Sequence, residues 1–471
     1  MNVDTLARQN LRQVSRLHRA SIRGWSTGTK TWLRSPTLAL SVVIGVATFI
    51  LRLSYAASRP TDLAGLEYVR GSLHFNVARD SPTAPGSWLY VAAGHAIHVV
   101  SGLSSVHSLV LLAALASAGA AALTCVAGTA LGGRWIGIAA GGLVATAPVS
   151  WFAGSVVSTY SFDAFLGALL VILARRARPY RAHGVVAVLA LGLGAGFQLS
   201  VVPFFILLAA VAVVGSVRTV GQLLEVVVAA VASVAVWFVP MIVIQPGGLH
   251  AWFHAVHLQI SMVAHTSSVF SAPASGVLTN IGTFGGWSLV SLGPVLAVAV
   301  VAVVVLAVAR VVTGQRGGNA TLRIWSTTGE QRDVIERPRY QTSGVILGAA
   351  LIPPIAVVTL GRFTAGGAVL GYLVPATVLL LLPVARLLHH RSWGLRRTTA
   401  VVASLLLVAA VAVNVQRFVD APAILPTSVA RHQPNLWISK PRYQAPYAET
   451  AAAIRAADRR SAEAGRTELH P

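Results

Sequence analysis

Residues 105–131 read S-V-H-S-L-V-L-L-A-A-L-A-S-A-G-A-A-A-L-T-C-V-A-G-T-A-L and contain no charged side chain. A helix crosses about 30 Å of hydrocarbon with roughly 20 residues, because it rises about 1.5 Å per residue. This stretch is therefore long and apolar enough to span a membrane. Its cysteine, Cys125, is the only one in the sequence, so one chain can form neither a disulfide nor a cysteine-based metal site.

The composition of the whole chain is that of a membrane protein. Of its 471 residues, 55% are hydrophobic and only 11% are charged, against roughly 25% charged residues in soluble domains. Lys and Arg outnumber Asp and Glu by 36 to 14. These basic residues stand in short clusters between apolar runs, which is how membrane proteins mark their cytoplasmic loops. The distribution therefore argues against a nucleic-acid partner.

Further apolar runs of similar length predict about eleven membrane crossings. They lie at 36–53, 134–150, 155–173, 184–198, 199–216, 223–244, 285–311, 343–360, 369–388 and 399–416. The two runs around Gln198 are the shortest and the weakest. The sequence thus predicts an all-α, polytopic helical bundle over residues 36–416, between a basic N-terminal segment (1–35) and a C-terminal tail (417–471).

Arginine clusters give this predicted bundle an orientation. They occur in the N-terminal segment and in three later loops, whereas 245–284 contains no Lys, Arg, Asp or Glu. Because basic loops face the cytoplasm, the N-terminus is predicted inside, and 245–284 and the tail outside. The segment 85–101 then has to lie on the outer surface as an amphipathic helix within a first outer loop, 54–104.

Two sets of acidic residues lie on the predicted outer face. The first outer loop contains Asp62, Glu67 and Asp80, each able to act as a general base toward a hydroxyl, to bind a divalent cation, or only to offset nearby arginines. Asp163 stands near the outer end of the run 155–173. A carboxylate in a span costs about 2.5–3.5 kcal/mol at mid-membrane and less near the interface, so it usually faces a polar cavity. The alternative for Asp163 is an acid favoured at a helix start by the helix dipole.

Other polar residues have weaker signals. Arg362 suits bidentate phosphate binding or interfacial snorkelling, and Gln198 suits phosphate binding or the satisfaction of backbone groups at a turn. Gly137 and Gly141 have the spacing of a close helix contact. Several histidines could bind a metal or only hydrogen-bond water; they are His95, His98, His250, His254, His257 and His265.

The order of these features resembles the GT-C class of membrane glycosyltransferases, and within it the branch related to protein O-mannosyltransferases. Asp62 and Glu67 precede A-P-G-S-W-L-Y (84–90), as an acidic loop precedes a Pro-containing surface helix in that class. A-P-V-S-W-F then precedes the second acidic motif, S-T-Y-S-F-D (158–163). L-G-L-G-A-G-F-Q-L-S resembles a Gly-rich turn with Gln198 in place of a basic residue, and G-R-F-T-A-G-G-A-V-L-G-Y-L-V-P-A (361–376) resembles the late Arg/Tyr-Leu-x-x-Pro segment. The adjacent Asp-Glu pair of the class is split here.

The resemblance implies a multi-pass enzyme of the cell envelope, and an Ala-, Val- and Arg-rich composition typical of GC-rich bacteria indicates the plasma membrane. Such an enzyme would move a sugar from a polyprenyl-phosphate donor to a hydroxyl of a protein, lipid or glycan on the outer face, with inversion. No cofactor is certain, and a divalent cation is an option. The implied catalytic residues are Asp62, Glu67 and Asp163, and the implied substrate-binding residues are Arg70, Tyr160, Gln198, Arg362 and Tyr372.

Two other functions stay open. A transporter or lipid flippase usually shows repeated halves and broken helices near the midplane, and the sequence has no evident internal repeat. A GT-C-like scaffold that has lost its chemistry is compatible with the split acidic pair.

Overall fold

The computed structural model describes residues 36–60, 63–132, 134–177, 182–199 and 201–267, together with 349, 409 and 411–416. Within these ranges the chain is all-helical and contains no strand, which confirms the predicted fold class at that level. The predicted runs 285–311, 343–360 and 369–388 and most of 399–416 lie outside the described residues.

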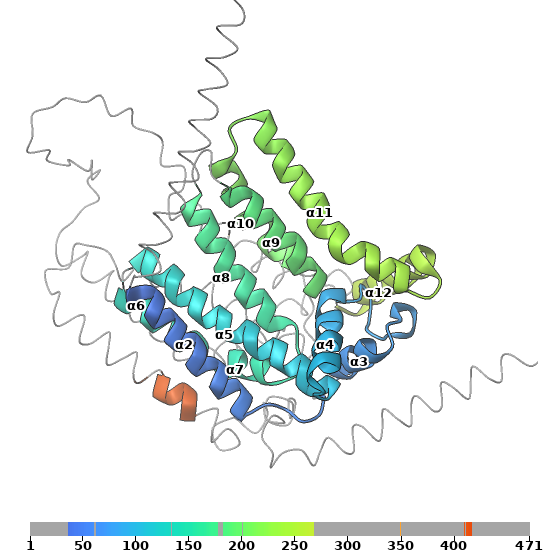
Figure 1. Ribbon diagram of the computed structural model, residues 1–471, viewed down its shortest axis with the longest axis horizontal. Coiled ribbons are helices and arrows are strands. Elements are labelled where there is room, and N and C mark those ends of the chain that lie inside the picture. Colours follow the sequence, from blue (N-terminus) through green and yellow to red (C-terminus); the bar gives the residue numbers. More distant parts are fainter. Residues whose placement is uncertain are drawn as a thin grey trace, which may run out of the picture.

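Within the described ranges, six long helices run side by side in an array, as Figure 1 shows. They are α2 (Pro36–Ser54), α5 (Ser105–Gly132), α8 (Tyr160–Arg176), α9 (His183–Phe197), α10 (Val201–Ser216) and α11 (Val220–Ile244). Shorter helices, α6 (Arg134–Thr146) and α7 (Pro148–Ser155), pack against α5. The α5–α6 connection, the end of α8 and the α10–α11 connection all lie at one end of the array (Figure 1).

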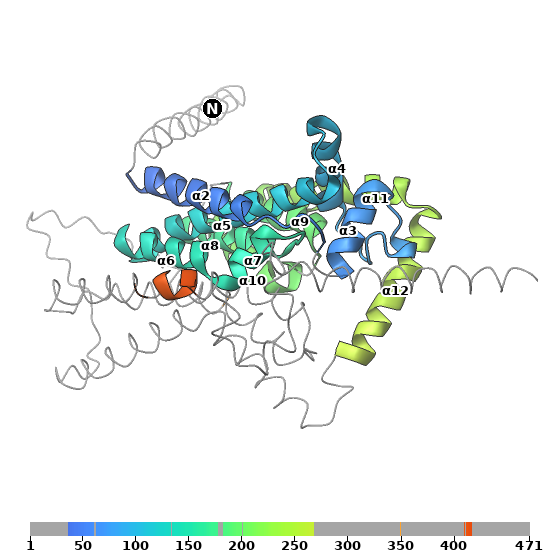
Figure 2. The same cartoon turned by 90° about the horizontal axis from the view of Figure 1, so that it is seen from below.

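The opposite end of the array carries the helices of the predicted first outer loop. These are α3 (Leu63–Leu73), the 3-10 helix η1 (Val77–Arg79) and α4 (Trp88–Ser101), with α12 (Gly248–Ser267) beside them (Figures 1 and 2). The helix predicted at 85–101 is therefore present, and it begins at Trp88. The uncharged segment after residue 245, predicted only as an outer loop, forms a helix of 20 residues.

Three of the described helices are long and apolar enough to cross a membrane: Thr37–Ser54, Ser105–Ala130 and Val220–Ile244. The run 134–150, predicted as one span, is a bent pair instead, with Gly137–Thr146 and Val149–Ser155 meeting at 61°, and this pair makes at most a fourth span. Proline lacks an N–H and cannot continue a helix without distortion, so the break falls at Pro148. α9 and α10 are apolar but shorter.

Two of these helices present apolar side chains to the surroundings. α11 exposes Val231, Val236 and Val243, and α2 exposes Val43 and Ile50. Large contiguous apolar surfaces are rare on water-soluble proteins, whereas the hydrocarbon of a bilayer accepts them. Together with the length of the helices, these faces indicate a membrane protein.

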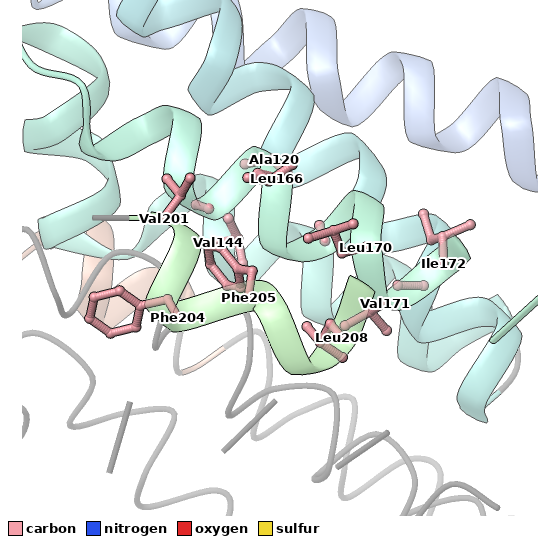
Figure 3. Packing of buried hydrophobic residues seen from close by; sticks show 14 of the residues in the cluster. Ala120, Val144, Leu166, Leu170, Val171, Ile172, Val201, Phe204, Phe205 and Leu208 are labelled. Atoms are coloured by element: carbon pink, nitrogen blue, oxygen red, sulfur yellow. The ribbon is translucent and has the colours of Figure 1, made fainter. Parts of the chain in front are cut away.

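The interior packs around α8, whose Leu166, Leu170 and Val171 lie among side chains of α5, α6 and α10 (Figure 3). Small residues let these helices approach closely. A Cβ added to Gly137 would come within 2.4 Å of the carbonyl oxygen of Cys125, and one on Gly141 within 2.9 Å of the Cβ of Cys125. The close contact predicted from the spacing of these two glycines is therefore confirmed between α5 and α6.

Candidate functional site

The first element of the site is α3, which carries Glu67, Tyr68 and Arg70 close together in its second half and leaves all three half-buried. The chain after α3 folds back over it, and Thr83 donates a hydrogen bond from Oγ1 to Glu67 Oε2. This contact fixes the carboxylate between α3 and the segment that leads into α4. The loop acid is thus held in place and is not simply solvated.

Three polar residues from distant segments meet beside α3. Tyr68 Oη lies 3.5 Å from Thr159 Oγ1, and Thr159 donates from the same hydroxyl to Gln198 Oε1. Thr159 precedes α8, and Gln198 ends α9 just before the turn to α10. We call Tyr68, Thr159 and Gln198 the junction cluster, because it joins the first outer loop, the α7–α8 connection and the α9–α10 turn.

Asp163 follows Thr159 of this cluster by about one helical turn along α8. It is four residues after Thr159, and Thr159 already has helical backbone angles, so the two side chains lie on the same side of the first turn of α8. Asp163 is only 4% exposed, and its Oδ1 has no hydrogen-bond partner among the described residues. A buried carboxylate oxygen is normally satisfied by protein or ordered water. The first turn of α8 therefore holds a carboxylate oxygen with capacity to accept a hydrogen bond from a ligand.

Buried hydroxyl groups accompany this carboxylate along the α7–α8 connection. Ser155, Ser158 and Ser161 are all buried, and neither Ser155 Oγ nor Ser161 Oγ has a partner in the part of the chain that the structure describes. Ser158 Oγ accepts a hydrogen bond from the backbone N–H of Tyr160. The connection is thus lined with small polar groups in an otherwise apolar interior, which is the composition expected of a site that receives a polar ligand.

An aromatic frame holds this connection against α4. Tyr90, which is fully buried, donates from its hydroxyl to the carbonyl of Leu109 at 3.0 Å and accepts from the N–H of Ser158 at 3.1 Å. Its ring makes edge contacts with Tyr68 and Phe162. Because Tyr90 belongs to the W-L-Y motif of α4, that motif positions the α7–α8 connection directly.

A second buried polar group lies alongside α7, where a Cβ added to Gly154 would come within 2.8 Å of Arg52 Nε. Arg52, in the last turn of α2, is fully buried; its Nη2 donates to the carbonyl of Ala145 at 2.7 Å and its Nε to Ser117 Oγ at 3.0 Å. The guanidinium also lies 5.6 Å from the ring centre of Trp151. The carbonyls at the end of α6 lose helical partners where Pro148 starts α7, and a cation is favoured at a helix C-terminus. Arg52 therefore stabilises the α6–α7 break through Nη2 and Nε, while its buried Nη1 has no hydrogen-bond partner among the described residues.

The predicted site residues fall into three groups. Tyr160 and Asp163 start α8, and Gln198 joins the junction cluster, so these three are brought near one another. Glu67 and Arg70 lie on α3, one residue before and two residues after Tyr68. The others lie outside the described residues: Asp62, Arg362 and Tyr372.

The described residues hold no group of three or more His, Cys, Asp or Glu side chains that could bind a metal ion. His95 and His98 lie on α4 with ring centres 6.4 Å apart, and His250, His254 and His257 lie on α12. A metal site made of these histidines alone is thus not formed in this part of the chain.

Sequence reasoning missed Tyr68, Tyr90, Thr159 and Arg52. Tyr68 and Thr159 adjoin residues that were singled out, and Tyr90 ends a quoted motif, so a signal existed for those three. Arg52 had the clearest signal, because it is the one charged residue within the apolar run 36–53.

The chain matches no family model, no curated protein and no solved structure.

Proposed function

We propose that the chain is a membrane glycosyltransferase that moves a sugar from a polyprenyl-phosphate donor to an acceptor hydroxyl on the outer face of the plasma membrane. The supporting observation is the meeting of three separate segments above Asp163, a buried carboxylate with an oxygen that no described residue hydrogen-bonds. They are the segments in which the sequence resembles the GT-C class: the first outer loop, the second acidic motif and the Gly-rich turn.

The proposed topology has about eleven spans, with the N-terminus in the cytoplasm. Arg134 begins α6, Arg176 ends α8 and Arg218 joins α10 to α11, and these three ends share the side of the array remote from α3 (Figure 1). Basic helix ends favour the cytoplasmic side of a membrane. This arrangement supports an outward-facing junction cluster, within reach of a lipid-linked donor that enters between helices.

In the proposed reaction, Asp62 or Glu67 takes the proton of the acceptor hydroxyl as its oxygen attacks the anomeric carbon. The new carbon–oxygen bond forms while the bond from that carbon to the phosphate oxygen breaks, so the configuration inverts and polyprenyl phosphate leaves. Asp163 and Tyr160 orient the sugar or the base. A carboxylate close to the anomeric carbon also stabilises the positive charge that develops there.

The donor phosphate needs cationic partners in this scheme. Arg70, on α3, and Arg362 would supply them, because a guanidinium matches phosphate oxygens in a bidentate manner. Gln198 and Tyr372 would complete the binding surface. A divalent cation held by Asp62 and Glu67 is the remaining option for charge compensation.

The test is transfer of radiolabelled sugar from polyprenyl-phosphate donors in membranes that contain the chain. Native protein is compared with Asp62→Asn and with Asp80→Asn as the matched control. Asp80 is an exposed loop acid with a left-handed backbone, a conformation that asparagine also adopts readily. We expect transfer by the native chain and the control, and a loss of about 10²–10⁴-fold in Asp62→Asn, the range of a general base. Equal transfer by all three would refute Asp62 as the base.

One observation favours a second candidate, a transporter or lipid flippase. The described array contains one bent helix pair, which breaks at Pro148 beside the buried Arg52, and broken helices around a buried charged group are typical of transporter binding sites. Movement of a lipid-linked sugar across proteoliposome membranes without any transfer product would establish that candidate. A bound donor that is neither moved nor consumed would leave the non-catalytic scaffold.

A further inference from the structure

A surface of the molecule outside the candidate site is formed by α12. This helix runs across the direction of the array rather than along it, and it lies at the end that carries α3 and α4 (Figure 2). One edge is anchored: Trp252 Nε1 donates to the carbonyl of Pro85 at 3.1 Å, and its ring contacts Phe238 of α11 at 5.2 Å between centres. The other edges of the helix carry exposed side chains.

The first exposed edge of α12 is apolar. Leu249, Phe253 and Ile260 are spaced four and seven residues apart, so they share one side of the helix. Phe253 is 58% exposed and Ile260 is 63% exposed. Exposed apolar residues in such a row mark a surface that another apolar phase or partner covers.

The second exposed edge is polar but carries no charged side chain of the Lys, Arg, Asp or Glu type. His250, His254 and His257 are spaced four and three residues apart and all three are exposed. Imidazole rings offer hydrogen bonds to phosphate and carbonyl oxygens without the cost of burying a permanent charge. Leu258 and Met262, which are also exposed, flank the histidines on their other side. A row of hydrogen-bonding groups between apolar side chains suits the boundary between acyl chains and headgroups.

The neighbouring helix, α11, indicates that lipid and not protein covers the apolar edge of α12. α11 leads into α12 through Gln245, and its exposed valines on a helix of spanning length suit lipid hydrocarbon. The apolar edge of α12 begins at Leu249, five residues after α11 ends at Ile244. A helix that lies across the spans, next to their ends, is positioned at the depth of the headgroups.

We propose that α12 is a membrane-surface helix that rests on the bilayer, with Leu249, Phe253 and Ile260 among the acyl chains and His250, His254 and His257 among the headgroups. The helix thereby fixes the depth of the adjoining first loop, because Trp252 joins it to Pro85. This inference depends on the membrane character of the chain and not on sugar transfer.

The test is the solvent accessibility of spin labels on the full-length chain in phospholipid vesicles. Cys125, which is the only cysteine, is first replaced by Ala. Single cysteines then carry the label at the six positions of the two edges. Collision with oxygen, which concentrates in acyl chains, is compared with collision with a water-soluble nickel chelate. Val231 on α11 is the lipid reference, and the exposed Arg79 of η1 is the aqueous reference.

We expect the oxygen-to-chelate ratio at Leu249, Phe253 and Ile260 to approach that of Val231 and to exceed the ratio at the three histidine positions severalfold. A ratio like that of Arg79 at all six positions would place α12 in water and overturn the proposal. Weak collision with both reagents at the apolar edge would mean that protein covers it, from this chain or a second copy, and would overturn it too.

Discussion

Two junctions between helices of the described array differ in how far their buried polar groups are satisfied. At the α6–α7 break, Arg52 is fully buried; its Nη2 and Nε donate to a carbonyl and a serine of neighbouring helices, and its Nη1 has no partner among the described residues. At the α9–α10 turn, Gln198 is half-buried and accepts from Thr159, one helical turn before a carboxylate oxygen that no described residue satisfies. Most of the guanidinium is thus engaged at the first junction, whereas Asp163 Oδ1 beside the second can still accept a hydrogen bond. This difference favours a structural role for the first and a ligand at the second.

The largest expected effect on the free energy of unfolding is at the α6–α7 break. Arg52→Ala removes the partner of the Ala145 carbonyl and leaves a cavity, so the free energy of unfolding should fall by about 3 kcal/mol or more. Reversible unfolding in mixed micelles measures it. Arg175→Ala is the control, because Arg175 lies at the end of α8 away from the break. A loss no larger than that of the control would mean that Arg52 does not hold the break.

A smaller loss of stability is expected from a change at the contact between α9 and α11. A Cβ on Gly192 would come within 1.9 Å of Ser233 Oγ on α11, so Gly192→Ala should cost about 1–3 kcal/mol of stability through overpacking. Adding Ser233→Gly removes the obstacle, and the double variant should recover most of the loss. Thermal unfolding of the two single variants and the double variant measures this coupling. Additive losses would show that α9 and α11 do not meet at this point.

The smallest effect on stability is expected at the α9–α10 turn. Gln198→Leu removes the hydrogen bond with Thr159, and Thr159→Val removes that bond and the contact with Tyr68. Each contact is worth about 1 kcal/mol, so the free energy of unfolding should fall by only about 1–2 kcal/mol. Transfer of labelled sugar should fall about tenfold or less in each variant, since roughly 1.4 kcal/mol corresponds to a factor of ten. The double variant should lose less than the two single losses combined, because the residues share one hydrogen bond. Unchanged transfer in all three would separate the junction cluster from the function.

Much of the fold follows from the apolar runs, because burying twenty apolar residues in lipid outweighs other local preferences. The runs 36–53, 105–131 and 223–244 correspond to helices of spanning length. The bend at Pro148 was foreseeable from the missing N–H of proline, but its stabilisation by Arg52 depends on a contact between residues 93 positions apart. No periodicity encodes such a contact.

The candidate site was predictable only in part. A lone acid within an apolar stretch is costly to insert into a membrane, and among the predicted spans only Asp163 and Glu225 carry this cost. The contact between Thr159 and Gln198 joins residues 39 positions apart, and that between Tyr68 and Thr159 joins residues 91 positions apart. These neighbours are set by the packing of α3, α8 and α9, which the pattern of apolar and polar residues does not specify.

The most direct measurement is sugar transfer by Asp163→Asn beside Asp80→Asn, at equal amounts of folded protein in the same membranes. Asparagine keeps the shape of the side chain and removes its negative charge. If Asp163 serves the reaction, transfer by its variant falls about 10²-fold, the scale of a lost electrostatic contribution to the transition state, while the Asp80 variant matches the native chain. Full transfer by Asp163→Asn would contradict a catalytic site at the start of α8.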